Sequence, residues 1–199
     1  MKNTEASVAM PKAPPAPKCS HRGEPIQVGP YTVYAGGSRY LTGSDLKGFD
    51  LILPLDRQVP LELGQVVTIT GVPWFDMDAP PKGFLEFLEE TVMPVIESGK
   101  KVLFYCTGGH GRTGTFLATL IALLEPETED PIAAARTRHC ENAVETRSQG
   151  DFIFNLRGQT LPLVYDEEFY LKELEMEELM NKWKSSKGSE VKTNCGMYQ

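Results

Sequence analysis

The chain has 199 residues, a formal net charge of −7 and four cysteines. The negative charge argues against general nucleic-acid binding, and no apolar run reaches the roughly 18 residues that a membrane span needs. We therefore expect neither a nucleic-acid partner nor a membrane anchor. Because the cysteines are few and scattered, we expect a reducing, cytoplasmic setting rather than a disulfide framework.

The length predicts one domain with two tails. We place this domain at residues 25–183, after a disordered Pro-rich segment over residues 1–24 and before a disordered tail over residues 184–199. The Cys-Ser-His tripeptide at residues 19–21 could form half of a metal site, but no second pair lies nearby in the sequence. We therefore interpret it as linker and expect no metal and no other cofactor.

Three short apolar segments predict the strands of a small sheet. Residues 31–35 alternate like an edge strand and end at a Gly-Gly pair, whereas residues 50–55 and 66–70 resemble buried strands. Arg39 lies in the loop after the first of these strands. It is a candidate contact for substrate, although a surface loop is the simpler interpretation.

The stretch over residues 71–81 predicts a loop, because it contains one glycine and three prolines around a Trp-Phe-Asp-Met-Asp run. Asp76 and Asp78 are candidates for a general acid, or for turn residues that bond their own backbone. Residues 81–100 then predict a helix with apolar residues on one face, which Pro94 should kink or shorten.

The most informative stretch follows this helix. Residues 102–105 predict a buried strand, the glycine-rich run after them predicts a tight loop, and residues 113–124 predict a buried helix. A strand, a glycine loop and a helix N-terminus form a cradle of backbone N–H groups for an anion. Cys106 opens this cradle and Arg112 closes it, so a nucleophilic thiol would face a phosphate that a planar guanidinium holds.

Cys106, five further residues, Arg112 and Thr113 resemble the signature of the cysteine-dependent protein tyrosine phosphatase superfamily, and the short core resembles its compact dual-specificity branch. The same glycines match the dinucleotide fingerprint G-x-G-x-x-G, but the strand with an acidic end that this motif requires does not follow the helix. A buried structural cysteine would leave the arginine and the glycines unexplained.

The resemblance implies an α/β fold in three layers, with a short, twisted central sheet flanked by helices and a phosphate-binding loop between a strand and a helix N-terminus. It implies that Cys106 is the nucleophile, that Arg112 holds the phosphate and that Asp76 is the general acid. Thr113 matches the hydroxyl that helps the thiolate depart, and Gln149 matches the glutamine that orients water. The candidates for substrate binding are Thr107, Gly108, Gly109, His110, Gly111, Arg112 and Arg39.

Other positions depart from the family or allow two interpretations. Tyr105 replaces the usual histidine and carries no positive charge, while His110 could add positive charge inside the loop, although we expect it to face solvent. Residues 131–146 predict a helix. Gln149 either serves catalysis or belongs to the cap of the next helix, and residues 162–180 predict an acidic C-terminal helix.

These residues together predict a phosphatase that acts through a phosphocysteine intermediate on phosphotyrosine, phosphoserine or phosphothreonine, with a phosphorylated protein as its partner. Relatives with the same loop use phosphoinositides, inositol phosphates or RNA 5′ ends, and a non-catalytic phosphate-binding module would also keep the cradle. A sulfur-transfer or arsenate-reducing enzyme would leave Asp76 and Thr113 without a role.

Overall fold

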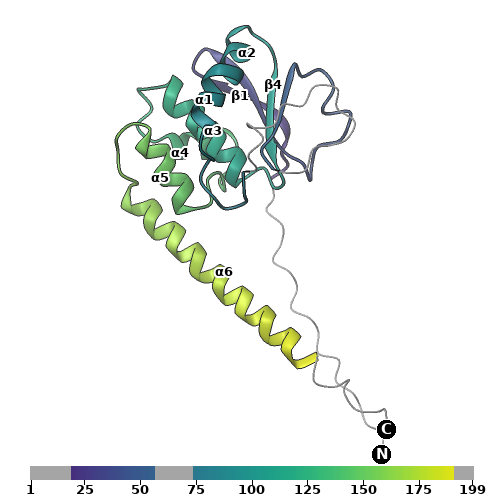
Figure 1. Cartoon of the computed structure of the whole chain (residues 1–199), viewed down its shortest axis with the longest axis vertical. Coiled ribbons are helices and arrows are strands. Elements are labelled where there is room, and N and C mark those ends of the chain that lie inside the picture. Colours follow the sequence, from purple (N-terminus) through teal and green to yellow (C-terminus); the bar gives the residue numbers. More distant parts are fainter. Residues whose placement is uncertain (1–18, 57–73, 191–199) are drawn as a thin grey trace, which may run out of the picture.

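The computed structural model describes residues 19–56 and 74–190, which form an α/β domain and a long C-terminal helix (Figure 1). The strands are β1 (Arg22–Val28), β2 (Tyr31–Gly37), β3 (Leu51–Pro54) and β4 (Val102–Cys106), in the order β1-β2-β4-β3. β1 and β2 are antiparallel, whereas β4 runs parallel to β2 and β3. The helices are α1 (Phe84–Phe87), the π-helical turn η1 (Leu88–Val92), α2 (Met93–Glu97), α3 (Gly111–Leu124), α4 (Pro131–Arg138), α5 (Arg147–Asn155) and α6 (Leu163–Glu190).

The two faces of the sheet are covered differently. Phe104 and Cys106 of β4 belong to the main core, which also contains the buried side chains of α3. Leu103 and Tyr105 point to the opposite face, because side chains alternate along a strand, and join a smaller cluster with Leu46. Among the described residues, loop side chains cover this second face and helices cover the first. The predicted α/β class and the loop between a strand and a helix N-terminus are confirmed.

The strand β1 was absent from the sequence-based prediction. It begins at Arg22, so the ordered domain starts before the predicted boundary at residue 25. β1 pairs with β2 through a two-residue turn at Gly29, whose φ is 54°. The predicted edge strand is therefore an inner strand, and β1 forms the edge. A Gly and a Pro inside its sequence conceal the strand pattern, and both residues are compatible with an edge.

Two predicted helices have different boundaries. The helix expected over residues 81–100 runs from Phe84 to Glu97. Its π-helical turn lies directly before the turn that contains Pro94. Proline has no N–H to donate to the preceding turn. The helix expected over residues 131–146 ends at Arg138, and a loop connects it to α5. The strand expected over residues 66–70 lies outside the described residues.

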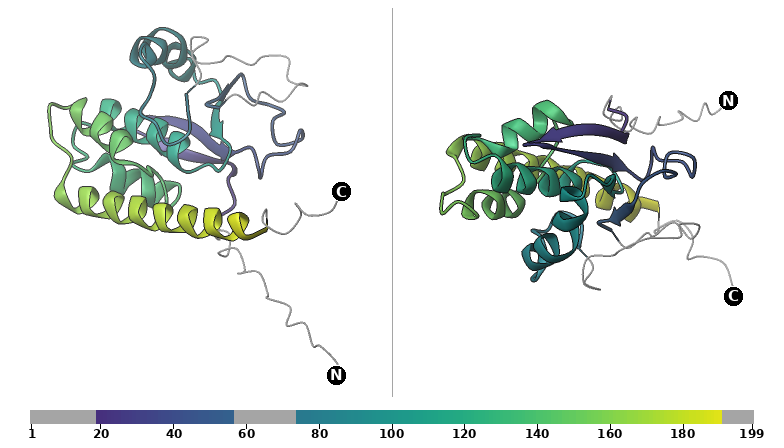
Figure 2. Two further views of the ribbon diagram at one scale, coloured as in Figure 1. Left: turned by 60° about the horizontal axis from the view of Figure 1, so that its bottom comes forward. Right: turned by 90° about the horizontal axis from the view of Figure 1, so that it is seen from above.

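Helix α6 runs along the domain and then extends beyond it (Figures 1 and 2). Its first turns are anchored, since Phe169 is fully buried and the Tyr165 hydroxyl donates to Asp130 at 2.7 Å. The helix continues to Glu190, past the predicted start of a disordered tail at residue 184.

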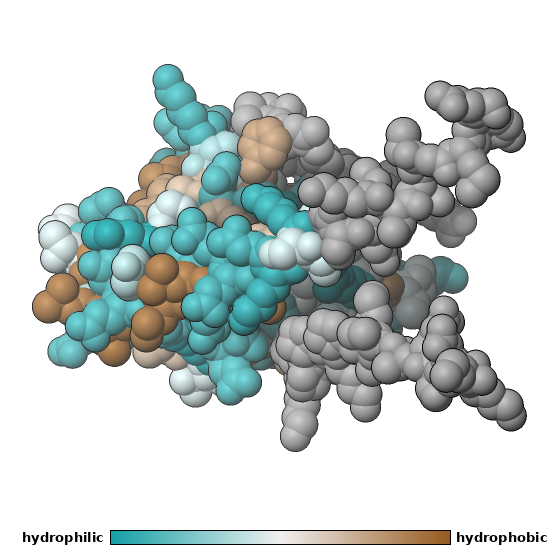
Figure 3. All heavy atoms as spheres, turned by 90° about the horizontal axis from the view of Figure 1, so that it is seen from below, coloured by the Kyte–Doolittle hydropathy of each residue, from teal (hydrophilic) through white to brown (hydrophobic). Residues whose placement is uncertain are grey.

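The exposed apolar side chains of α6 are Leu163, Val164, Tyr170, Leu171, Leu174, Met176, Leu179, Met180 and Trp183. Viewed from below, hydrophobic surface occurs in small patches between hydrophilic residues (Figure 3). No helix within residues 19–56 and 74–190 is long and apolar enough to cross a membrane.

Glu125 links the end of α3 to two other parts of the domain. Its carboxylate accepts hydrogen bonds from the Gly29 N–H at 2.6 Å, from the Thr128 hydroxyl at 3.0 Å and from both terminal nitrogens of Arg138 at 2.7 and 2.8 Å. The hydrogen bonds from Arg138 are the main reason why the pKa of Glu125 falls from 4.5 to about 2.

Glu125→Gln should lower the free energy of unfolding at pH 7 by about 2 kcal/mol. Because the pKa of Glu125 is depressed in the folded state, its contribution is complete above pH 4.5 and disappears as the pH falls towards 2. Urea unfolding of both proteins between pH 3 and pH 7 measures this difference. The exposed Glu129, changed to Gln, is the control. A difference between wild type and Glu125→Gln that stays constant with pH would contradict the assignment.

Candidate active site

The loop between β4 and α3 encloses the Cys106 thiol. The Gly109 N–H donates to the Cys106 sulfur at 3.3 Å, and Gly109 has a φ of 80°, which a residue without a side chain adopts readily. The Cys106 N–H donates to the Thr113 hydroxyl oxygen at 2.8 Å, and that hydroxyl donates to the Gly36 carbonyl at 3.2 Å. Thr113 thus joins the two ends of the loop to β2, and its hydroxyl has backbone partners in this state.

The end of β2 packs directly against this loop. A Cβ atom on Gly37 would lie 2.9 Å from the carbonyl group of Gly108, so a larger residue would displace the loop. The Arg39 N–H donates to the Thr107 carbonyl at 3.2 Å. Arg39 therefore contacts the loop through its backbone, while its side chain is exposed. Within the loop, the residues that are buried are Gly109, His110 and Gly111.

Arg112 connects the phosphate loop to the loop that carries the candidate acid. Its side chain is buried, and it donates to the Trp74 carbonyl at 3.0 Å and forms an ion pair with Asp76 at 3.1 Å. Its Nε is buried and has no partner among the described residues. The Asp76 side chain is 71% exposed. Of the two acidic candidates, Asp76 is the one whose carboxylate reaches the arginine.

The acid loop is held in place by backbone carbonyls. The Trp74 indole N–H donates to the Asp78 carbonyl at 2.9 Å, and the Gln149 amide donates to the same oxygen at 3.3 Å. The Thr146 hydroxyl donates to the carbonyl of Met77 at 2.9 Å, and Met77 has a φ of 67°. Asp78 therefore contributes its backbone, and the start of α5 holds the loop that presents Asp76.

Gln149 lies between the cap of α5, the acid loop and the phosphate loop. Its N–H donates to the hydroxyl of Thr146, which caps α5, at 3.3 Å. Its side chain is fully buried, accepts the Glu145 N–H at 2.9 Å and contacts the acid loop. A Cβ atom on Gly111 would lie 3.2 Å from the Gln149 amide nitrogen, so the side chain also reaches the phosphate loop.

Two aromatic side chains near the nucleophile are buried, and for His110 this differs from the expectation. His110 does not face solvent, because it is 9% exposed and its ring lies edge-on to His21 at a centroid distance of 4.8 Å. Burial lowers the pKa of His110, and the charges of the nearby His139 and Arg39 lower it further, so the folded state disfavours a positive charge on this ring. The Tyr105 hydroxyl is buried without a hydrogen-bond partner among the described residues, and burial raises its pKa.

Sequence reasoning missed two carboxylates beside the phosphate loop. The Thr107 hydroxyl donates to Asp56 at 2.6 Å, which fixes the start of the loop. The Glu145 carboxylate lies against Gly111, and a Cβ atom at that glycine would overlap with it. Burial raises the pKa of Glu145, and the charge of Asp76 raises it further. Neither residue belongs to a motif, and only the folded chain brings them to the site.

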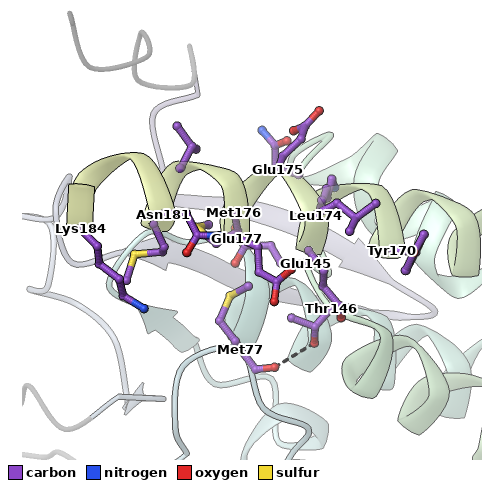
Figure 4. A pocket seen from close by; sticks show the side chains of 15 residues that line it. Met77, Glu145, Thr146, Tyr170, Leu174, Glu175, Met176, Glu177, Asn181 and Lys184 are labelled. Carbon is purple, nitrogen blue, oxygen red and sulfur yellow. Dashed lines mark hydrogen bonds between the residues drawn. The ribbon is translucent and has the colours of Figure 1, made fainter. Parts of the chain in front are cut away.

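A pocket of about 980 Å³ lies beside the acid loop (Figure 4). Its walls come from the acid loop through Met77, from the loop before α5 through Glu145 and Thr146, and from α6. The α6 residues include apolar Tyr170, Leu174 and Met176 together with Lys172. Since Glu145 lies against the phosphate loop, the pocket borders the candidate site.

The sheet, the loop around Cys106 and the position of Asp76 together define a compact dual-specificity phosphatase-like fold. The solved structures agree. The active form of Tk-PTP is 23% identical, with a TM-score of 0.50 over 63% of this chain and 90% of that chain. The kinase-associated phosphatase with a substitution of its catalytic-site cysteine to serine is 17% identical, with a TM-score of 0.51 over 67% of this chain and 95% of that chain.

The sequence comparisons point in the same direction. Residues 41–124 match the family described as a polymorphic toxin system DSP-PTPase phosphatase, and this span contains both Asp76 and the loop from Cys106 to Arg112. Two uncharacterized proteins of Methanocaldococcus jannaschii are each 37% identical to this chain over 82 residues. That region is 41% of this chain and 54% or 50% of theirs, so the chain spans about half the length of these relatives.

Proposed function

We propose that the protein is a cysteine-dependent phosphatase that hydrolyses phosphate monoesters on the side chains of other proteins. The observation that carries this proposal is the convergence of three groups. The Cys106 thiol lies inside the loop, the buried Arg112 guanidinium closes the loop, and Asp76 reaches that guanidinium at 3.1 Å. A nucleophile, an anion holder and a proton donor are the groups that phosphoryl transfer to a thiolate requires.

The proposed reaction has two steps. In the first, the Cys106 thiolate attacks phosphorus, the bond from phosphorus to the ester oxygen breaks, and Asp76 gives its proton to the departing oxygen. Arg112 and the loop N–H groups stabilise the phosphoryl oxygens. In the second, water attacks the phosphocysteine, the bond from sulfur to phosphorus breaks, and Asp76 accepts the proton of the water. Gln149 orients this water, and Thr113 assists the departure of the thiolate.

The surroundings of the site favour a protein substrate over a highly charged small molecule. Glu145 lies next to the phosphate loop and His110 is buried, so the loop offers Arg112 as its cation while a carboxylate borders it. The adjacent pocket, with apolar and polar walls, can receive residues that flank a phosphorylated side chain. We place the activity in the cytoplasm, where a reducing environment keeps the nucleophilic thiol available.

The test is a substrate panel with the purified full chain. We expect release of phosphate from phosphotyrosine, phosphoserine or phosphothreonine peptides, and less from phosphoinositides, inositol phosphates and RNA 5′-triphosphate ends. Turnover of only the lipid or RNA substrates would overturn the protein-substrate assignment. Phosphate binding without turnover of any substrate, including an activated aryl phosphate, would instead identify a binding module.

A further inference from the structure

Four potential metal ligands from three separate segments meet behind the phosphate loop. They are Cys19 and His21 from the chain before β1, His110 from the phosphate loop and Cys140 from the loop after α4. Their ligand atoms all lie within 4.8 Å of one another. His21, His110 and Cys140 are buried, and Cys19 is partly buried. The sequence contains only half of this group as a local motif, since the two remaining ligands are brought together by folding.

Within this cluster the histidine ring nitrogens lie close to the cysteine sulfur atoms. The His110 Nδ1 lies 3.3 Å from the Cys140 sulfur, and its Nε2 lies 3.9 Å from the Cys19 sulfur. The His21 Nε2 is buried and has no hydrogen-bond partner among the described residues. A buried polar nitrogen without a partner is costly, whereas the same nitrogen is a good ligand for a metal ion.

The donor set matches one metal in particular. Two thiolates and two imidazoles around a closed, buried position are the ligands of structural zinc sites, where Zn–S distances are about 2.3 Å and Zn–N distances about 2.0–2.1 Å. Tetrahedral geometry then places neighbouring ligand atoms roughly 3.3–3.8 Å apart. The cluster already lies close to this range, and a modest contraction would complete it.

We propose that Cys19, His21, His110 and Cys140 bind one Zn²⁺ ion in a structural site that fixes the phosphate loop to the N-terminal segment and to the loop after α4. All four tetrahedral positions are taken by protein ligands, so the site holds no open position for substrate. This proposal replaces the sequence-based expectation of no metal, and it does not depend on the proposed phosphatase activity.

A second layer of contacts supports the ligands. The ring of His139 lies 4.5 Å from the ring of His21, and its Nε2 lies 2.7 Å from the Gly109 carbonyl. A Cβ atom on Gly109 would approach the His21 ring within 2.7 Å, so His21 packs directly on the phosphate loop. Partners of this kind orient the ligands of metal sites. Metal binding at His110 would thus restrain the loop that ends at Arg112.

The test measures metal directly in the Cys106→Ser background, which excludes binding by the nucleophilic thiol. The full-length chain, purified under reducing conditions and dialysed with Zn²⁺, should retain about one equivalent of zinc by elemental analysis. Replacement of the zinc by Co²⁺ should give the intense visible bands of a tetrahedral site and the ultraviolet band of cobalt–thiolate bonds. Removal of the metal should lower Tm by roughly 5 °C or more.

Two ligand variants, one matched control and one variant of a supporting residue complete the experiment. Cys140→Ser and His21→Gln should each lose the zinc and the cobalt spectrum, whereas Cys195→Ser should keep about one equivalent. His139→Gln keeps all four ligands and should still bind zinc, with a lower affinity. Retention of zinc by both ligand variants would overturn the proposal, and so would loss in His139→Gln with retention in His21→Gln. A chain that binds no zinc and shows a Cys19–Cys140 disulfide by mass spectrometry would also overturn it.

Discussion

Cys106→Ser is expected to reduce the turnover of an activated aryl phosphate by about 10⁴-fold or more, because loss of a covalent nucleophile removes the chemical step that the rest of the site serves. A serine hydroxyl stays protonated at neutral pH and has no general base among its described contacts. Binding of phosphate or vanadate should persist, since Arg112 and the loop N–H groups are unchanged. Steady-state kinetics and isothermal calorimetry measure the two quantities separately.

Arg112→Lys tests the group that binds the oxyanion, as Cys106→Ser tests the nucleophile. It keeps a positive charge but removes the planar fork that contacts Trp74 and Asp76, so it should weaken oxyanion binding as well as turnover. Cys195→Ser, which removes a thiol outside the described residues, controls for the removal of a thiol. Appreciable turnover by Cys106→Ser would eliminate Cys106 as the nucleophile, whatever the behaviour of the other variants.

Asp76→Asn should slow the turnover of phosphotyrosine or phosphoserine by roughly 10²–10⁴-fold, the usual contribution of a positioned acid. An alkyl or tyrosyl oxygen leaves slowly unless it is protonated, whereas a strongly activated phenolate departs largely unaided. The loss should therefore be much smaller for an activated aryl phosphate. Measuring kcat for a series of leaving groups gives the dependence of the rate on leaving-group basicity, which should become steeper in this variant.

Asp78→Asn is a closely matched control, because it changes an exposed carboxylate two residues away in the same loop. The backbone carbonyl that Trp74 and Gln149 contact is retained in this variant. Its leaving-group dependence should remain that of the wild type. A larger loss of turnover in Asp78→Asn than in Asp76→Asn would identify Asp78 as the general acid. Equal rates in the wild type and both variants would place the general acid outside this loop.

Local sequence patterns predicted much of the fold. The strand, glycine loop and helix around Cys106 are continuous in the chain, so their order predicted the cradle, and the resemblance to the phosphatase superfamily implied the α/β class. β1 was missed because a glycine and a proline interrupt its alternation, although pairing with β2 stabilises it as an edge. The end of α4 at Arg138 was missed because no glycine or proline marks a helix end between residues 139 and 146.

The candidate site was predictable where its residues share a motif. Cys106 and Arg112 lie on one loop, and the structure places the carboxylate of Asp76 against Arg112. Glu145 and Asp56 were not predictable, because neither has a local pattern and each reaches the phosphate loop only through the folded chain. For the same reason the sequence assigned His110 to solvent, although it meets His21 from a distant segment.

In the ion pair between Asp76 and Arg112, the Asp76 carboxylate occupies the guanidinium that an incoming anion would bind. Asp76 therefore competes with anions for Arg112. A group tethered by a short stretch of chain has an effective concentration on the order of millimolar. A free anion that binds the guanidinium must displace this carboxylate, which lowers the apparent affinity of the anion for the cradle. If the proposed function holds, a phosphorylated side chain that also contacts the surface beside the acid loop would lose less of its affinity to this competition than a small anion would.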